Sequence, residues 1–189
     1  MEDFYMGTSN NETYHQQNIQ QNTQKLRNLL REMPGFCKDY FRGIEPSTSA
    51  RTRIGYAYDI RTFFRFLVSE NPVLKNTEIK DINLTHLDMV EPVDIEEYME
   101  YLKLYYYDGQ KYTNDERGLH RKMASLRSFY LYYQKRDMIK NNPTVVVNMP
   151  KLHDREIIRL DPDEVAELLE LVEHGGNNLS GIKKTYYEK

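Results

Sequence analysis

Residues 114–135 read NDERGLHRKMASLRSFYLYYQK, and the spacing of their apolar residues predicts a helix with two unlike faces. Four apolar side chains return to the face that begins at Leu119: Met123, Leu126, Tyr130 and Tyr133. The opposite face carries charged and small residues: Arg117, Arg121, Ala124, Ser128 and Lys135. One face is therefore expected in a protein core. The other is a basic strip that could approach a nucleic-acid backbone, although a solvated surface strip would show the same pattern.

A second amphipathic helix is predicted over residues 50–70, after N-cap candidates at 47–49 and before Asn71-Pro72. Its apolar side carries Tyr56, Ile60, Phe63, Phe64 and Leu67. Its other side carries Arg51, Tyr58, Thr62 and Arg65. Gly55 lies on this second side, where a glycine inside a helix costs about 1 kcal/mol relative to alanine. Either the helix tolerates this glycine, or another surface approaches closely there.

Two more helices complete the predicted bundle. Residues 13–33 are weakly amphipathic and end at Pro34-Gly35. Residues 92–107 begin with a proline and end at Asp108-Gly109. The packing stripe of this helix is Ile95, Tyr98, Met99, Leu102 and Tyr106. Its acidic residues form a solvated outer face and receive no catalytic role: Asp94, Glu96, Glu97 and Glu100.

Composition excludes several classes of protein. The 189 residues contain no apolar run of the 18 or more that a membrane-spanning helix needs, and the chain starts with acids where a signal peptide has bases. Its one cysteine, Cys37, cannot form an internal disulfide, and its five histidines lack metal-ligand spacing. We therefore expect a cytoplasmic protein with no metal site, no cofactor, no membrane contact and no small-molecule substrate.

The net charge of −3 hides a segregation of charge along the chain. Residues 51–65 hold four Arg and one Asp, net +3, and residues 111–155 hold ten bases and four acids, net +6. Between them, residues 78–108 are net −7, and residues 156–174 are net −6. A mildly acidic chain thus carries two basic segments, which is compatible with one basic face on the folded body or with ordinary solvated surface.

The end of the chain is organised differently. Asn142-Pro143 interrupts the helical pattern, and an extended basic connector is expected up to Arg155. Residues 161–164, DPDE, are a helix-start signature with a proline at the first helical position. The helix that follows has the apolar stripe Val165, Leu168, Leu169 and Val172 and is expected to end at Gly175-Gly176. Because this apolar helix has no partner in the remaining sequence, it is expected to open another domain.

Three stretches together resemble the tyrosine recombinase (phage integrase) family. They are STSARTRIGYAYDIRTFFRFL at 47–67, HRKMASLRSFYLYYQKRDMIKNNP at 120–143 and MPKLHDREIIRLDPDEVAELLELV at 149–172. The first is similar to the family's opening helix, with Ile60 in place of the usual Leu, and the second to its fourth helix and Asn-Pro exit. The third is similar to the interdomain linker and the first helix of the catalytic domain.

The resemblance implies an all-α fold, a four- to five-helix core-binding (SAM-like) bundle at residues 13–145. It also implies a linker at 146–159 and an orphan helix within the beginning of a truncated catalytic domain at 160–189. Residues 1–12 are polar and lack periodicity, so a disordered start is expected there. Such a bundle forms half of a C-shaped clamp on double-stranded DNA. The implied DNA-binding residues are Arg51, Thr52, Arg53, Arg61, Arg65, Arg117, Arg121, Lys122, Ser125, Arg127 and Lys151. By the helical wheel Arg117 and Arg121 point outward best, whereas Arg53 and Arg127 lie nearer the packing side.

The family's catalysis needs an Arg, a Lys, a His-x-x-Arg box, a further His or Trp and a nucleophilic Tyr. No histidine of this chain has Arg three residues later, and Tyr186 and Tyr187 lack activating partners. We therefore expect DNA binding without catalysis from this chain. The resemblance implies that the full-length parent cleaves and rejoins DNA through a 3′-phosphotyrosyl intermediate, without metal or nucleotide, as a tetramer on two duplexes.

A different class of function stays open. The chain holds 16 tyrosines and no tryptophan, and its amphipathic helices could serve a non-enzymatic helical protein-interaction module. Tyr105, Tyr106 and Tyr107 cannot share one helical face, so at least one is expected to be exposed.

Overall fold

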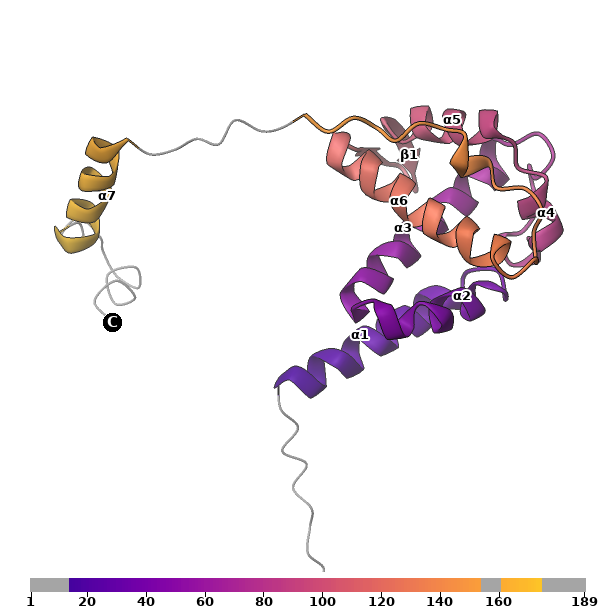
Figure 1. Ribbon diagram of the computed structural model, residues 1–189, viewed down its shortest axis with the longest axis horizontal. Coiled ribbons are helices and arrows are strands. Elements are labelled where there is room, and N and C mark those ends of the chain that lie inside the picture. The colour runs from indigo at the N-terminus through magenta and orange to yellow at the C-terminus, as the bar shows by residue number, and fades with distance from the viewer. Residues whose placement is uncertain (1–13, 154–160, 175–189) are drawn as a thin grey trace, which may run out of the picture. The chain divides into compact units, whose positions relative to one another are not determined.

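The computed structural model describes residues 14–153 and 161–174 (Figure 1). The disordered start predicted at 1–12 and the helix end predicted at Gly175-Gly176 lie outside these ranges. The chain divides into two compact units, and the boundary between them follows Leu152.

The first unit is helical, which confirms the all-α prediction. Its helices, in chain order, are α1 (Tyr14–Leu30), α2 (Cys37–Gly43), α3 (Ala50–Glu70), α4 (Leu84–Asp88), α5 (Pro92–Tyr101) and α6 (Glu116–Gln134). Short 3-10 turns lie at Glu45–Ser47, Ile79–Asp81 and Pro143–Val145. A small hairpin separates α5 from α6, with strands β1 (Leu104–Tyr107) and β2 (Gln110–Thr113).

Local capping explains where the two long central helices begin. The Ser49 hydroxyl accepts a hydrogen bond from the Thr52 amide at 3.1 Å, which starts α3 at the predicted residue. The Asp115 carboxylate accepts from the Gly118 amide at 2.8 Å and starts α6. At α5, Asp94 closes a capping box by accepting from the Glu91 amide at 2.7 Å. Asp94 therefore has a structural role, in contrast to the exposed acids on the same helix.

The core lies between α3 and α6 and is rich in aromatic rings. Its largest fully buried aromatic side chains are Tyr40, Tyr98, Tyr130, Tyr133, Phe63, Phe64 and Phe129. Many pack edge to face, as Tyr40 and Phe129 do with ring centroids 5.0 Å apart. Each buried tyrosine hydroxyl donates to an acceptor: Tyr40 to Ser128 Oγ, Tyr98 to the Asp59 carbonyl, Tyr130 to the Leu87 carbonyl and Tyr133 to the Phe36 carbonyl. The polar ends of these rings are thus satisfied inside the bundle.

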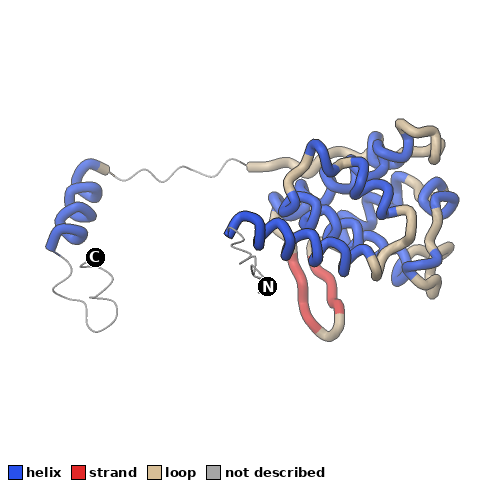
Figure 2. The backbone as a smooth tube through the Cα atoms, turned by 90° about the horizontal axis from the view of Figure 1, so that it is seen from below, coloured by secondary structure: helices blue, strands red, loops and turns tan. Residues whose placement is uncertain are grey.

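The predicted helix over 92–107 is wrong beyond Tyr101. The chain there turns into an antiparallel hairpin that projects from the helices (Figure 2), with Leu104 opposite Thr113 and Tyr107 opposite Gln110. Asp108 and Gly109 adopt positive φ values of 50° and 71°, which the tight turn between β1 and β2 requires. The Asn114 amide donates to the Leu102 carbonyl at 2.7 Å and closes the base of the hairpin.

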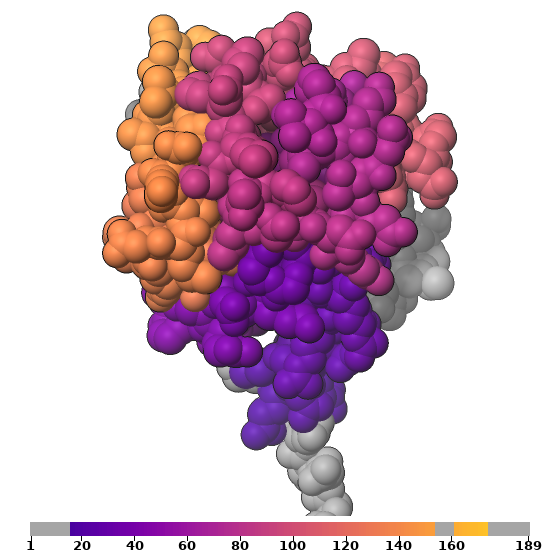
Figure 3. Space-filling view, turned by 90° about the vertical axis from the view of Figure 1, so that its right-hand side faces the viewer, coloured from indigo at the N-terminus to yellow at the C-terminus, as the bar shows by residue number. Residues whose placement is uncertain are grey.

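The segment after α6 folds back onto the body instead of extending away from it. The Asp88 carboxylate accepts hydrogen bonds from the Lys140 and Asn141 amides, both at 2.7 Å. Figure 3 shows this segment, in orange, beside the stretch that contains α4 and α5. The connector predicted between Pro143 and Arg155 is therefore not extended over residues 144–147, since Pro143–Val145 forms a 3-10 turn and Val147 is buried.

The second unit is described over residues 161–174 by α7 (Pro162–His174). The Asp161 amide donates to the Glu164 carboxylate at 2.9 Å, as expected for the predicted helix start. The apolar side chains of α7 are exposed: Val165, Leu168, Leu169, Leu171 and Val172. Across the described parts of the chain, no helix combines the length and the hydropathy needed to cross a bilayer.

Candidate nucleic-acid interface

One buried carboxylate holds α3 against α6. The Asp59 side chain is 1% exposed and accepts hydrogen bonds from the Arg121 guanidinium and, at 3.1 Å, from the Lys122 ammonium. Gly55 lies one helical turn before Asp59, and a Cβ added there would lie 3.6 Å from Arg121 Nη1. The Arg121 side chain nevertheless stays 50% exposed. A guanidinium fixed by an internal partner therefore faces solvent where the two helices meet.

Further cations lie on the same two helices. Arg51 and Thr52 are exposed in the first turn of α3, two turns before Asp59. Arg117 is exposed in the first turn of α6, one turn before Arg121. The fold thus brings together the two basic segments that the sequence separates by an acidic one. We call the exposed residues Arg51, Thr52, Arg117 and Arg121 the α3–α6 basic surface.

Two predicted residues of α3 are half-buried and lie beside aromatic rings. Arg61 makes an ion pair with Glu32, in the turn after α1, at 2.6 Å and lies over the Tyr58 ring at 5.1 Å. The guanidinium of Arg65 lies 3.8 Å from the centre of the Tyr107 ring. Burial, and next the charge of Arg61, lower the pKa of Arg65. An anion placed near Arg61 and Arg65 would therefore be held by two adjacent positive charges.

Four of the implied DNA-binding residues are used inside the fold. Arg53 is 9% exposed and pairs with Glu45 at 2.6 Å. Lys122 is 8% exposed in its pair with Asp59, and Ser125 is fully buried, where its hydroxyl donates to the Lys122 carbonyl at 2.8 Å. Arg127 donates to the Thr144 and Val147 carbonyls at 3.1 and 2.6 Å.

The inward placement of Arg53 and Arg127 agrees with the helical wheel, whereas the implied DNA contacts of Lys122 and Ser125 are corrected, because both side chains are buried. A helical wheel gives the direction of a side chain but not the internal acceptor that captures it. Lys151 is exposed near the end of the first unit and stays a predicted contact.

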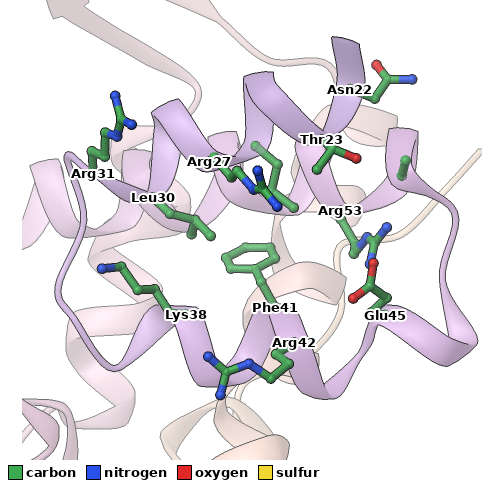
Figure 4. Close-up of a pocket in the computed structure, with 12 residues that line it drawn as sticks. Asn22, Thr23, Arg27, Leu30, Arg31, Lys38, Phe41, Arg42, Glu45 and Arg53 are labelled. Atoms are coloured by element: carbon green, nitrogen blue, oxygen red, sulfur yellow. The ribbon is translucent and has the colours of Figure 1, made fainter. Parts of the chain in front are cut away.

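A second basic feature lies between α1 and α2. A groove of about 490 Å³ has Arg27 and Arg31 on its α1 side and Lys38 and Arg42 on its α2 side (Figure 4). Its floor is apolar and consists of Leu26, Leu30 and Phe41. The acid that lines it, Glu45, is already paired with Arg53. This groove was not predicted from the sequence. Its residues come from two helices, and the apolar pattern of each helix does not show that the two are in contact.

No group of three or more His, Cys, Asp or Glu residues in residues 14–153 and 161–174 could hold a metal ion. Cys37 is buried, and burial raises the pKa of its thiol, so this group is not a ready nucleophile. The surface features found here are suited to binding.

No family model matches the chain, and no solved structure matches it. Among curated proteins, tyrosine recombinase XerC of Caldanaerobacter subterraneus is 34% identical over 142 residues, covering 71% of this chain and 38% of the relative. XerC of Leptospira interrogans is 29% identical over 140 residues, covering 74% and 39%. A tyrosine recombinase of Pseudothermotoga lettingae is 34% identical over 122 residues, covering 65% and 36%.

With these relatives and this helical fold, the chain belongs to the tyrosine recombinase family. It spans less than two fifths of the length of the curated relatives that it matches.

Proposed function

We propose that residues 13–145 are the core-binding (SAM-like) domain of a site-specific tyrosine recombinase and bind double-stranded DNA through the α3–α6 basic surface. Residues 146–159 are the linker, and residues 160–189 begin the catalytic domain. The position of the Arg121 side chain is the observation that carries the proposal. Asp59 orients the Arg121 guanidinium, the Arg121 side chain is half exposed, and the neighbouring Gly55 leaves room for a partner.

Membership of the family supports this proposal, because the relatives are tyrosine recombinases. DNA recombination and integration by the whole protein, its assembly as a tetramer on two duplexes and its place in the cytoplasm are part of the same proposal. The catalytic steps of recombination are not assigned to residues of this chain, because none of its five histidines begins a His-x-x-Arg box.

Fluorescence anisotropy with a labelled duplex of about 30 base pairs tests the proposal. Affinity should fall with salt, with a slope of about −0.9 in log K against log salt for each phosphate neutralised. Arg51→Gln and Arg117→Gln should each weaken binding and reduce the slope by about one contact. Lys75 is an exposed lysine in the loop after α3, so Lys75→Gln is the matched control and should change neither the affinity nor the salt slope. Absence of binding by the unmodified chain near 20 mM salt would refute the function.

The groove between α1 and α2 favours a second candidate function, a protein-interaction module. Its four cations and apolar floor fit an acidic amphipathic segment of a partner protein. A designed peptide with Glu on one face and Leu on the other is a suitable probe for calorimetric titration. Arg31→Glu together with Lys38→Glu should abolish its binding, whereas Lys75→Glu should not. If both variants bound the peptide equally, the groove would be excluded as the peptide's binding site.

A further inference from the structure

The β1–β2 hairpin contributes little to the core but is firmly held. All four residues of β2 and three of the four in β1 are exposed, and Tyr106 is 65% exposed. Rings at its base nevertheless stack in sequence: Tyr101 on Tyr105 at 4.9 Å and Tyr105 on Tyr112 at 5.1 Å, with interplanar angles of 23° and 14°. The hairpin is thus held in place by stacked tyrosine rings at its base, while its far end is exposed and free to contact a partner.

A pocket of about 280 Å³ lies between the hairpin and α3. Its lining carries three cationic side chains, Arg61, Arg65 and Lys122, and no acidic one. The remaining lining residues are Tyr58, Thr62, Tyr101, Tyr105, Tyr107 and Tyr112, whose hydroxyls can donate hydrogen bonds.

The positive charge of this pocket is only partly neutralised. Arg61 is paired with Glu32 and Lys122 with Asp59, whereas Arg65 makes no ion pair with a residue in the described ranges. The Arg65 guanidinium instead lies against the Tyr107 ring, which leaves its charge available. The lining of this pocket therefore suits an anion, and cations together with hydroxyl donors are suited to a phosphate.

The pocket adjoins the α3–α6 basic surface. Lys122 follows Arg121 on α6, and Thr62 lies about one turn beyond Asp59 on α3. We propose that a DNA backbone phosphate occupies this pocket, held by Arg65, and that the hairpin lies along the DNA as an arm beyond the two helices. This inference rests on the proposed DNA binding and adds the pocket at Arg65 and the hairpin to the contacts of the α3–α6 basic surface.

The test compares two arginines that each lie over a tyrosine ring. Arg65 lies 3.8 Å from the Tyr107 ring centre, and Arg136, in the turn after α6, lies 3.7 Å from the Tyr132 ring centre. Arg65→Gln should reduce the salt slope by about 0.9, so that its affinity deficit shrinks about threefold between about 50 and 200 mM salt. Arg136→Gln should leave the slope of the full chain unchanged. Circular dichroism checks that both variants are folded.

A second measurement needs no variant. Acetylation of the unmodified chain, read by mass spectrometry, should show Lys111 in β2 protected by the duplex and Lys140 unprotected. If the unmodified chain binds DNA but Arg65→Gln keeps its full slope and Lys111 stays reactive, the hairpin contact is refuted and the proposed function stands. If the unmodified chain does not bind, the proposed function itself fails, and this inference fails with it.

Discussion

The Lys122 ammonium of α6 donates a hydrogen bond to the Asp59 carboxylate of α3 at 3.1 Å, although both side chains are at most 9% exposed. The second Asp59 oxygen binds the half-exposed Arg121. One internal carboxylate therefore joins the two central helices and orients the proposed DNA contact. Stability and binding are linked through the same residue.

Asp59→Asn should lower the free energy of unfolding by about 3–5 kcal/mol, because it leaves the buried Lys122 charge without its counter-charge. Urea denaturation followed by circular dichroism measures this change. Asp39→Asn is the control: its ion pair with Arg42 is exposed at 3.5 Å, so the change should stay within about 1 kcal/mol. Equal effects of the two substitutions would show that the Asp59 pair is not buried in solution.

Gly55→Ala should raise the free energy of unfolding by about 0.5–1 kcal/mol, because alanine favours the helix and the new Cβ would meet Arg121 at an ordinary contact distance of 3.6 Å. Thermal melting tests the stability. Anisotropy on the same variant tests for close approach of DNA, which the added methyl group would weaken. A lower melting temperature would contradict the stability prediction.

Local signals predicted the long helices α1, α3 and α6 well. The bounds of α3 were predicted from Ser49 and Asn71-Pro72, because capping and termination depend on neighbouring residues. The hairpin was missed because Tyr106 continued a helical stripe, whereas the Asp108-Gly109 turn and the tyrosine stack favour strands. Aromatic residues suit strands as well as helix faces, so the pattern alone was ambiguous.

The candidate site was predicted less completely, for a non-local reason. Lys122 is captured by Asp59, which lies 63 positions earlier, and Arg127 by carbonyls of a segment that folds back onto α6. Neither partner can be identified from the helical wheel of α6. Arg51, Arg117 and Arg121, in contrast, are exposed as the wheel indicated.

Gly43→Ala should lower the free energy of unfolding by about 1–3 kcal/mol, because the added methyl group would overlap the Tyr132 ring. The ring cannot move away freely, since the Tyr132 hydroxyl donates to the Asp39 carbonyl at 2.8 Å. Gly35→Ala is the matched control, with no atom within 4 Å of its new methyl group. Urea denaturation of both variants measures the difference, and an equal, small effect would show that α2 and Tyr132 are not in contact in solution.

High pH should unfold the chain through its buried tyrosines. Burial raises the pKa of Tyr40, Tyr98, Tyr130 and Tyr133 above the ordinary value of 10.0. These groups ionise more easily in the unfolded chain, so their stabilisation is complete below pH 10 and is lost progressively above it. Each group that is ionised only in the unfolded chain lowers the free energy of unfolding by about 1.4 kcal/mol per pH unit.

Urea denaturation at a series of pH values from about 8 to 11 measures this loss, and absorbance near 295 nm counts the ionised tyrosines. Stability should be nearly flat until about pH 9 and fall steeply beyond pH 10, with the buried tyrosines ionising together with unfolding. If all 16 tyrosines ionised near pH 10 while the chain stayed folded, the tyrosine-lined core described here would be wrong. Because the charged residues of the α3–α6 basic surface are arginines, whose charge persists over this range, loss of DNA binding by this surface should follow unfolding.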